Sequence, residues 1–584
     1  MRRRAVFTLF LLGACGVRAA GERPNVVVIL ADDQGWGDLS CHGNANLKTP
    51  RIDSLARDGA LFDRFFVCAL CAPTRAEFLT GRYYSRTGVH GVTTGAERMN
   101  LDETTIADTF RAAGYATGAF GKWHNGTQYP YHPNARGFEE FYGFCSGHWG
   151  HYFDPPLEHN GAPVRGKGYI ADDLTDHAID FIKRHKGGPF FCYLPYNTPH
   201  SPFQVPDRFH DRFAGAEIAM RHRDPQKEDL ATTRCVLAMC ENIDWNVGRV
   251  LDALAELELD GTTIVVYFSD NGPNSWRWNG GMRGRKGSTD EGGLRVPCLV
   301  RWPGRIAPGT RISRIAGAID LVPTLADMAG VSLIGAKPLD GVSVAPLLRD
   351  PQAAWPDRML FSRQEGKFSV RTQTHRLDAA GRLFDMTADP GQDRDIAGKA
   401  PETAARLAAA VASWRAEVLP TGWKDDRPFP VGYAAFPATP LPARDGVPSG
   451  GARRSARAPN CSFFTGWKDT GDRIAWDIEV ATAGVYEAVI NYTCPAGDVG
   501  ATVELSFGSS RVTAKVVEAH DPPLVGAADD RVPRGSESYV KDFRPLRLGE
   551  FRLAEGRGSL VLRALDIPGS QVMDVRSVVL TLRK

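Results

Sequence analysis

Continuous apolar runs recur along the first half of the chain, with helical patterns between them. The runs at residues 25–30 (NVVVIL), 189–196, 262–268 and 295–302 are rich in β-branched and aromatic residues. Such runs are typical of strands that are buried on both faces of a sheet. Stretches such as "TIADTFRAAG" and "LTDHAIDFIKRH" show helical spacing instead. Alternating strands and helices predict an α/β fold with a mostly parallel sheet flanked by helices, over residues 22–350.

The pattern changes near residue 351. Residues 351–420 read as short antiparallel strands followed by a helix, which predicts a small α+β subdomain. Proline- and glycine-rich sequence over residues 421–452 predicts a linker. From residue 453 to residue 584, apolar and polar positions alternate between turn signals. That alternation predicts an additional all-β sandwich or jelly-roll domain.

The N-terminus has the pattern of an export signal. "MRRR" precedes a short apolar run and then small residues, as in a secretory signal peptide, and the run is short for a membrane span. We predict a signal peptide at residues 1–19, cleaved after Ala19, and an exported protein that is periplasmic or secreted. The alternative is a lipoprotein box, "LGAC", with Cys15 as the lipid anchor. No later run predicts a transmembrane segment.

Charge and cysteine content narrow the function classes. The 584 residues carry a formal net charge of only +2, so no nucleic-acid partner is expected. The 11 cysteines are spread along the chain rather than clustered as a disulfide framework. A pairing of Cys461 with Cys494 stays open. Four cysteines stand within apolar patterns and are predicted to be buried thiols: Cys192, Cys235, Cys240 and Cys298.

Oxygen-bearing side chains follow two of the predicted strands. Asp32 and Asp33 come directly after the run at 25–30, and Asp270 and Asn271 come after the run at 262–268. In a parallel sheet, functional sites lie at the carboxyl ends of the strands. Either pair alone is explained by a helix cap or an Asx-turn. Together they predict a site for a hard cation, Ca²⁺ or Mg²⁺.

The stretch "CALCAPTRAEFLTGR" at residues 68–82 carries the sharpest motif. A zinc knuckle would need a second ligand pair of similar spacing, which is not evident. "CAPTRAEFLTG" instead resembles the signature of the type I, formylglycine-dependent sulfatases of the alkaline phosphatase superfamily. "ADDQGWGD", "GKWH", "NTPHSPF", "SDNGP" and "GRKGSTDEGGLRVP" also match motifs of that family, in its chain order. The resemblance covers residues 23–417.

The resemblance implies a modified residue and a bound ion. A separate maturation enzyme would oxidise Cys71 to Cα-formylglycine, with Cys68 a bystander. The hydrated aldehyde would attack the sulfur of the ester, carry the sulfate covalently and then release it. One Ca²⁺ per active site would be held by five residues: Asp32, Asp33, Cys71, Asp270 and Asn271. The ligand set alone also admits Mg²⁺.

The same resemblance assigns roles to further residues. Arg75 would stabilise the diol at residue 71. Lys122 and Lys286 would bind sulfate oxygens. His124 would take a proton from the second hydroxyl, and His200 would protonate the leaving alcohol. One departure is Asn125, which stands where the family commonly has an apolar residue and begins an "NGT" glycosylation sequon. A glycan there would obstruct the site, which indicates either a bacterial source or an unused sequon.

Aromatic and histidine residues point to a carbohydrate substrate. The segment 143–161, "GFCSGHWGHYFDPPLEHNG", suits the faces and hydroxyls of sugar rings. We predict that His148 and His151, with Trp149, bind the leaving group. Arg277 and Arg283 are predicted to meet other anionic groups of a glycan.

The C-terminal β domain resembles carbohydrate-binding modules. Trp467 and Trp476 then either bind a sugar or belong to the domain's core. The leading hypothesis is therefore a sulfatase that acts on a sulfated carbohydrate. The alternatives are a phosphonate or phosphate monoester hydrolase of the same superfamily and a catalytically inactive glycan-binding protein. The inactive reading is disfavoured because every expected catalytic position is filled.

Overall fold

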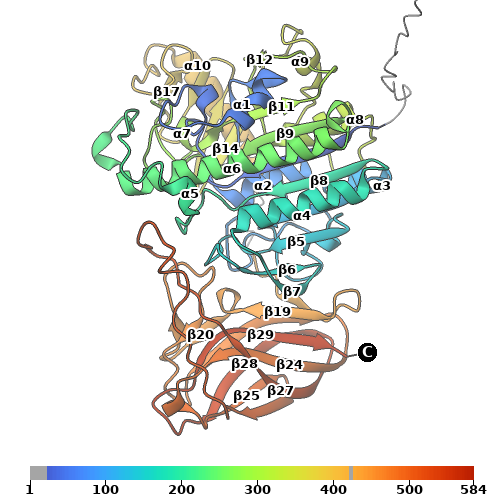
Figure 1. Ribbon diagram of the computed structural model, residues 1–584, viewed down its shortest axis with the longest axis vertical. Helices are drawn as coiled ribbons and strands as arrows, with labels where there is room; N and C mark the ends of the chain where they lie inside the picture. The colour runs from blue at the N-terminus through green and yellow to red at the C-terminus, as the bar shows by residue number, and fades with distance from the viewer. Residues whose placement is uncertain (1–22, 420–424, 584) are drawn as a thin grey trace, which may run out of the picture.

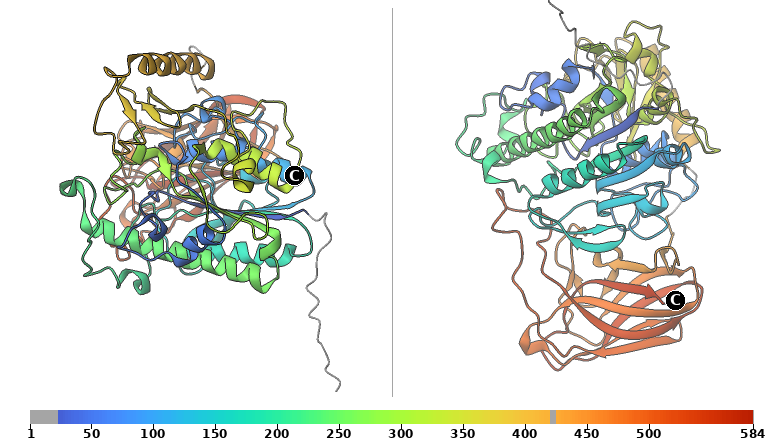
Figure 2. Two further views of the ribbon diagram at one scale, coloured as in Figure 1. Left: turned by 90° about the horizontal axis from the view of Figure 1, so that it is seen from above. Right: turned by 45° about the vertical axis from the view of Figure 1, so that its right-hand side comes forward.

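The computed structural model describes residues 23–419 and 425–583. The predicted signal peptide, its cleavage after Ala19 and the alternative anchor at Cys15 lie outside the described residues. An upper α/β unit stands on a smaller, lower β unit (Figure 1), and the long axis of the molecule passes through both (Figure 2).

A ten-stranded mixed sheet forms the middle of the α/β unit. Its central strands β9, β1, β8, β4 and β5 are all parallel, and antiparallel strands flank them. The strands, in spatial order, are β12 (Thr310–Ile312), β2 (Ala60–Phe62), β11 (Cys298–Arg301), β9 (Thr263–Ser269), β1 (Asn25–Ala31), β8 (Phe190–Pro195), β4 (Ala116–Lys122), β5 (Glu140–Phe144), β6 (Pro156–His159) and β7 (Ala162–Arg165). The α/β prediction is confirmed.

Helices cover both faces of this sheet because its strands are apolar on both sides. Val27 and Ile29 of β1 pack in a core with α1, α4 and α6, whereas Val26 and Val28 pack in a second core with α2, α3 and α8. Figure 1 shows α4 and α6 lying side by side across the near face. The helices are α1 (Pro50–Arg57), α2 (Cys71–Thr80), α3 (Ile106–Ala112), α4 (Ile170–His185), α5 (Asp207–His210), α6 (Leu230–Glu256), α7 (Glu291–Leu294), α8 (Leu321–Ala329), α9 (Ala345–Arg349) and α10 (Pro401–Val418).

Two small sheets complete the upper unit. Strands β10 (Arg295–Val296), β3 (Phe65–Phe66) and β13 (Ala316–Gly317) form one of them. The other is an antiparallel sheet of β14 (Leu360–Gln364), β15 (Lys367–Arg371), β16 (His375–Leu377) and β17 (Leu383–Asp385). Helix α10 packs on that sheet through Leu407, and Trp414 of the same helix stacks on Phe361.

The lower unit contains two antiparallel-rich sheets around one apolar core. The first sheet comprises β18 (Phe429–Val431), β23 (Arg473–Val480), β28 (Gly556–Asp566), β25 (Thr502–Phe507), β26 (Ser510–Lys515) and β20 (Val447–Ser449). The second comprises β21 (Arg453–Arg454), β22 (Phe464–Thr465), β29 (Asp574–Leu582), β24 (Gly484–Thr493), β27 (Arg544–Leu553) and β19 (Ala438–Pro442).

The linker prediction for residues 421–452 does not hold for β18, β19 and β20, which pair with strands of the β unit. Pro430 and Pro448 sit in strands that pair only with β23. Proline is tolerated in a strand where its missing N–H is not needed for the ladder. The same prolines that suggested a linker are therefore compatible with peripheral strands.

Trp467 and Trp476 belong to the core of the β unit, because their exposed fractions are only 1% and 0%. The Trp476 indole also donates a hydrogen bond to the Pro442 carbonyl at 3.0 Å. The core alternative for these two tryptophans is confirmed.

The cysteines of the described residues are all free thiols. Cys192, Cys235, Cys240 and Cys298 are buried as predicted. Cys461 contacts the carbonyl of His148, and Cys494 contacts the carbonyl of Val572, so the two do not pair with each other.

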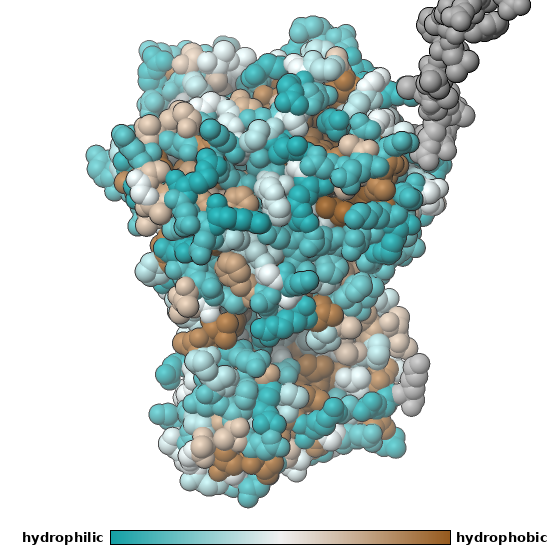
Figure 3. All heavy atoms as spheres, viewed as in Figure 1, coloured by the Kyte–Doolittle hydropathy of each residue, from teal (hydrophilic) through white to brown (hydrophobic). Residues whose placement is uncertain are grey.

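Hydrophilic residues cover most of the face in Figure 3, and hydrophobic residues form small separate groups on it. Among the helices of the described residues, none combines the length and apolarity that a bilayer crossing requires.

We expect Trp476→Ala to lower the free energy of unfolding of the β unit by about 3–5 kcal/mol, because the substitution opens a cavity in a closed core. Urea denaturation followed by tryptophan fluorescence measures this. The control is Val447→Ala on strand β20, where the side chain is 66% exposed, with an expected change within about 0.5 kcal/mol. Equal effects of the two substitutions would show that Trp476 does not support the core.

Candidate active site

The polar cluster forms where strands β1 and β9 end side by side. The two strands pair in parallel with Ala31 opposite Ser269, so Asp32 and Asp270 follow at the same level. The Asp33 amide donates to Asp270 Oδ1 at 3.1 Å, and Asn271 Nδ2 donates to Asp33 Oδ1 at 2.7 Å. Asp33 has a φ of 71°, a left-handed conformation that is uncommon outside glycine and is concentrated at functional sites.

Each of the three carboxylates has a cationic partner from a different part of the chain. Lys122, the last residue of β4, places Nζ 2.6 Å from Asp32 Oδ2. Lys286 Nζ lies 2.6 Å from Asp33 Oδ1. Arg75 of α2 donates from Nη2 to Asp270 Oδ2 at 2.8 Å. The structure thus brings together residues that lie far apart in the chain, as Lys286 and Asp33 do.

Burial makes these charges strongly interdependent. All three carboxylates are fully buried, and burial alone raises their pKa values. For Asp32, the charges of Lys122, His200 and Arg75 outweigh that effect and hold the pKa well below its usual range. For Asp270, burial and the neighbouring Asp32 charge prevail and raise the pKa to about 7. A further positive charge near these oxygens would favour the ionised form of all three.

The residues present fit a hard divalent cation. Asp32 Oδ1, Asp33 Oδ2 and Asn271 Oδ1 are buried and have no hydrogen-bond partner among the described residues. Leaving such oxygens unsatisfied inside a protein is costly. Carboxylate and amide oxygens are the ligands that Ca²⁺ and Mg²⁺ prefer. These three oxygens without hydrogen-bond partners are therefore the atoms that would hold an ion.

Cys71 begins helix α2 directly beside these oxygens. Its Sγ and one carboxylate oxygen each of Asp32 and Asp270 all lie within 4.8 Å of one another. Burial raises the pKa of this thiol, although Lys122 and Lys286 act in the opposite direction. Cys68 lies three residues earlier, where its thiol contacts Glu77 and its amide donates to Thr74 Oγ1 at 2.9 Å.

His124 lies two residues beyond Lys122 with a φ of 63°. Its Nε2 lies 2.8 Å from the Val92 carbonyl oxygen, and Nδ1 is buried without a partner among the described residues. Burial and the charge of Lys122 hold the pKa of His124 well below its usual range. A Cβ on Gly147 would lie 2.1 Å from His124 Nε2, so only glycine at that position leaves room for this ring.

His200 lies on the loop after strand β8, which pairs with β1. Its Nε2 is 3.6 Å from Asp33 Oδ2, and its Nδ1 is 2.7 Å from the Ser201 carbonyl oxygen. The imidazole is 12% exposed, in contrast to the buried His124 ring. His200 therefore borders the cluster at a place that solvent can reach.

The predicted leaving-group residues separate into two groups. His148 joins the site, because its ring centroid is 5.5 Å from that of His200, and burial lowers its pKa to about 4. His151 is held elsewhere, since its Nε2 contacts Asp529 Oδ2 at 2.8 Å. Trp149 stacks on Phe144 with Arg576 above it. The leaving-group role of His151 and Trp149 stays a prediction.

The predicted role of Arg277 is wrong. Its side chain is 1% exposed and binds Asp38 at 2.6 Å, so it cannot meet a glycan. Arg283 is likewise held by Asp290 and Asp378, at 2.9 and 3.3 Å.

Asn125 is only 1% exposed, and its Nδ2 donates to the carbonyl groups of Ala72 and Glu97. A glycan on that nitrogen is incompatible with this packing, which agrees with an unused sequon.

Sequence reasoning missed Glu537, which approaches the site from the β unit. Its Oε1 accepts a hydrogen bond from Ser201 Oγ at 2.7 Å and lies 3.4 Å from His148 Nδ1. The residue follows the catalytic motifs by more than 200 positions and belongs to no recognisable motif. Only the packing of the two units reveals it.

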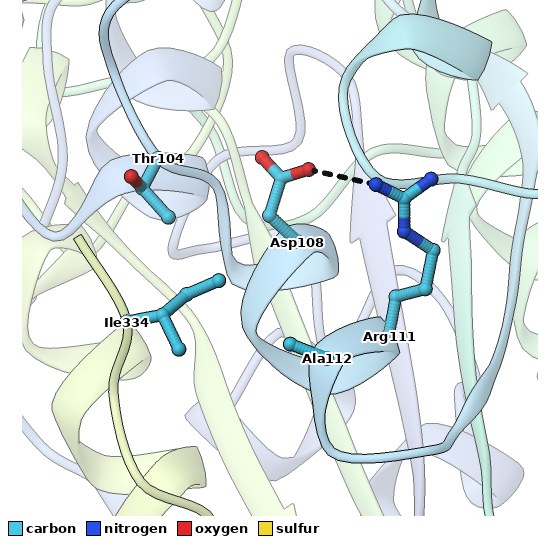
Figure 4. A pocket seen from close by; sticks show the side chains of 5 residues that line it. All are labelled: Thr104, Asp108, Arg111, Ala112 and Ile334. Atoms are coloured by element: carbon cyan, nitrogen blue, oxygen red, sulfur yellow. Dashed lines mark ion pairs between the residues drawn. The ribbon is translucent and has the colours of Figure 1, made fainter.

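A surface hollow in Figure 4 is unrelated to this cluster. Thr104, Ile334 and three residues of α3 line it, and its charged pair, Asp108 and Arg111, is an exposed contact of 3.8 Å within one helix. None of the sequence-predicted site residues lines the hollow.

Comparisons with known proteins agree with this geometry. Residues 24–331 match the "Sulfatase" family model, and residues 286–407 match the model "N-sulphoglucosamine sulphohydrolase, C-terminal". Arylsulfatase A of Bos taurus is 33% identical over 482 residues, which cover 70% of this chain and 90% of that protein. N-acetylgalactosamine-6-sulfatase of Mus musculus is 31% identical over 394 residues, covering 60% and 71% respectively.

Among solved structures, "Ps i-CgsB in complex with k-i-k-neocarrahexaose" superposes with a TM-score of 0.63 at 29% identity, covering 69% of this chain and 95% of that one. The sulfatase model alone spans more than half of the chain. With the strand-end carboxylates, their cationic partners and the cysteine motif in one buried cluster, the chain belongs to the sulfatase family and is a sulfuric ester hydrolase.

Proposed function

We propose that the protein hydrolyses sulfate esters of a sulfated carbohydrate, with residue 71 in the form of Cα-formylglycine and with one Ca²⁺ ion. The observation that carries the proposal is the buried arrangement of Cys71, three carboxylates and three cations at the ends of β1 and β9. The proposal requires a maturation enzyme as a partner, and export as predicted from residues 1–19.

The cations of the site suit an anionic ester. Lys122 and Lys286 both act electrostatically on Cys71, so a sulfate ester placed against residue 71 would meet two ammonium groups. Lys286 is 17% exposed while Asp33 beside it is fully buried. Lys286 is therefore the cation that an incoming ester would reach first. Ammonium groups act there as compact charges on the sulfate oxygens.

Two groups absent from the unmodified chain would supply the remaining chemistry. As a hydrated aldehyde, residue 71 would provide one hydroxyl that bonds to sulfur and a second that expels the sulfate. A Ca²⁺ ion held by Asp32, Asp33, Asp270 and Asn271 would add positive charge for the ester and acidify a hydroxyl at that residue.

The histidines suit opposite proton transfers. His124 has a depressed pKa and an unpartnered, buried Nδ1, which suits a group that accepts a proton. Both ring nitrogens of His200 face oxygen atoms, and part of the ring is in contact with solvent, which suits the donor for the leaving alcohol. Arg75 is held by Asp270 and by the Lys122 carbonyl at 2.6 Å. It thereby fixes the start of α2, and with it residue 71.

A carbohydrate is the substrate class that we infer, for two reasons. The relative from Mus musculus is named an N-acetylgalactosamine-6-sulfatase, and Ps i-CgsB was solved in complex with k-i-k-neocarrahexaose. The side chains that border His200, namely His148, Ser201 and Glu537, are polar groups that can bind hydroxyls.

A panel of esters tests the proposed function. We expect matured protein to release sulfate from an aryl sulfate and from at least one of a set of hexose and hexosamine monosulfates. The matching phosphate and phosphonate esters should be poorer substrates. Cys71→Ala should lower kcat/KM by roughly 10³-fold or more while the fold persists, because no residue then accepts the sulfuryl group.

The control for this panel is Cys68→Ala, which removes the neighbouring thiol and should keep activity. The mass of the peptide that contains residue 71 shows whether maturation has occurred. Faster hydrolysis of the phosphorus esters, or persistent turnover by Cys71→Ala, would contradict the proposal.

Metal removal gives a second prediction. Dialysis against a chelator should abolish turnover, and Ca²⁺ should restore it and raise the thermal midpoint, since an ion that binds only the native state stabilises it. Elemental analysis should find about one Ca²⁺ per chain in the wild type and none in Asp33→Asn. The matched control is Asp58→Asn, whose carboxylate pairs with Arg57 on the surface. Full metal content in Asp33→Asn would refute the assigned ligand set.

The role of His200 predicts a dependence on the leaving group. His200→Ala should lower kcat/KM for a sugar sulfate by about 10²-fold or more, because an alkoxide must be protonated as it leaves. An activated aryl sulfate, whose phenolate leaves unaided, should lose far less. Steady-state kinetics with the two ester classes decide this, and losses of equal size would argue against proton donation by His200.

A further inference from the structure

The long loop between β26 and β27, residues 516–543, reaches from the β unit to the α/β unit. Figures 1 and 2 show this brown-red loop rising along the side of the molecule toward α5. Asp529 of the loop contacts His151, and Gln204 Nε2 donates to Asp530 Oδ1 at 2.7 Å and to the Gly526 carbonyl at 3.0 Å. The Arg531 amide also donates to the Phe203 carbonyl at 2.9 Å. The loop therefore forms hydrogen bonds with the segment that follows His200.

Residues 536–538 of the loop also form hydrogen bonds within the β unit. The Ala458 amide donates to the Ser536 carbonyl at 2.9 Å, and the hydroxyls of Ser455 and Ser538 are 2.7 Å apart. Residue 537 is thus flanked on both sides by positions that are fixed to the β unit. The backbone at residue 537 is therefore fixed in the absence of substrate.

Glu537 extends from this part of the loop to the border of the catalytic cluster. Its carboxylate and the rings of His148 and His200 offer atoms that all lie within 4.8 Å of one another. Oε1 accepts a hydrogen bond from Ser201 Oγ, whereas Oε2 forms no hydrogen bond with a described residue. The side chain is 20% exposed. Although burial works against ionisation, His148 and His200 keep the pKa of Glu537 below its usual range.

A carboxylate is an unexpected group beside an anion-binding site. It repels the sulfate ester rather than attracting it, so it adds nothing to binding of the group that is cleaved. It stands instead next to His200, the residue on the side of the leaving alcohol. Carboxylate oxygens with free lone pairs accept hydrogen bonds from hydroxyls, and such charge-assisted bonds are stronger than neutral ones.

We propose that Glu537, supplied by the β unit, is a specificity-determining residue that accepts a hydrogen bond from a hydroxyl of the leaving-group sugar next to the cleaved ester. The same charge rejects a leaving group that carries a second sulfate at that place. This inference rests on the proposed function. If it holds, the β unit contributes a residue to the active site. The preferred substrates are then sugars that carry no second sulfate next to the cleaved ester.

The test compares Glu537→Gln and Glu537→Ala with the wild type on three esters. These are an aryl sulfate, the hexose or hexosamine monosulfate that the wild type hydrolyses fastest, and the same sugar with a second sulfate on the adjacent carbon. We expect Glu537→Gln to lower kcat/KM for the monosulfate about tenfold, the loss of one charge-assisted hydrogen bond. Activity on the aryl sulfate should stay within about twofold, and the preference for monosulfate over disulfate should shrink.

Glu518→Gln is the matched control, because Glu518 lies on the same loop, is 60% exposed and pairs with Arg544 away from the site. It should behave as the wild type on all three esters. A merely structural role for Glu537 would appear as equal losses on the aryl sulfate and the sugar in both variants, and that result would overturn the inference. So would an unchanged monosulfate-to-disulfate ratio, or turnover of the aryl sulfate with no sugar accepted. Absence of turnover with every ester would instead overturn the proposed function.

Discussion

The site depends on the pairing of buried opposite charges at the ends of two parallel strands. Three carboxylates that are removed from water need compensation, because unpaired buried charge is strongly destabilising. Lys122, Lys286 and Arg75 provide it from β4, from a glycine-rich loop and from α2. Each ion pair therefore joins an element of the α/β unit to the same point. The compensation leaves three oxygens unsatisfied, and those oxygens are the basis for inferring an ion.

Strand register explains why the site could be foreseen from the sequence. Apolar runs identified β1 and β9, and parallel pairing with Ala31 opposite Ser269 brings their following residues together. The motifs around Cys71, Lys122, His200 and Lys286 gave the remaining positions through resemblance. Trp476 illustrates a different case, since the sequence allowed both a sugar-binding role and a core role. Only its burial in the β unit separates the two.

Other features depend on contacts with residues that are distant in the chain, and no local sequence pattern predicts those contacts. The sequence left Arg277 free to bind a glycan, but in the structure its side chain contacts Asp38, which is 239 residues away in the chain. His151 is taken by Asp529 at a separation of 378 residues. Residues 421–452 looked like a linker because proline-rich edge strands lack the alternation that marks interior ones. Glu537 had no signal, because its place is set by the docking of a loop from another unit.

We propose that the four oxygen side chains at these strand ends hold a divalent ion against an oxidised residue 71. The most direct measurement is a crystal structure of natively matured protein grown with Ca²⁺ and recorded with anomalous data. We expect one calcium peak about 2.3–2.6 Å from oxygens of Asp32, Asp33, Asp270 and Asn271, and no sulfur at residue 71. Density for an intact cysteine with no ion among those oxygens would contradict it.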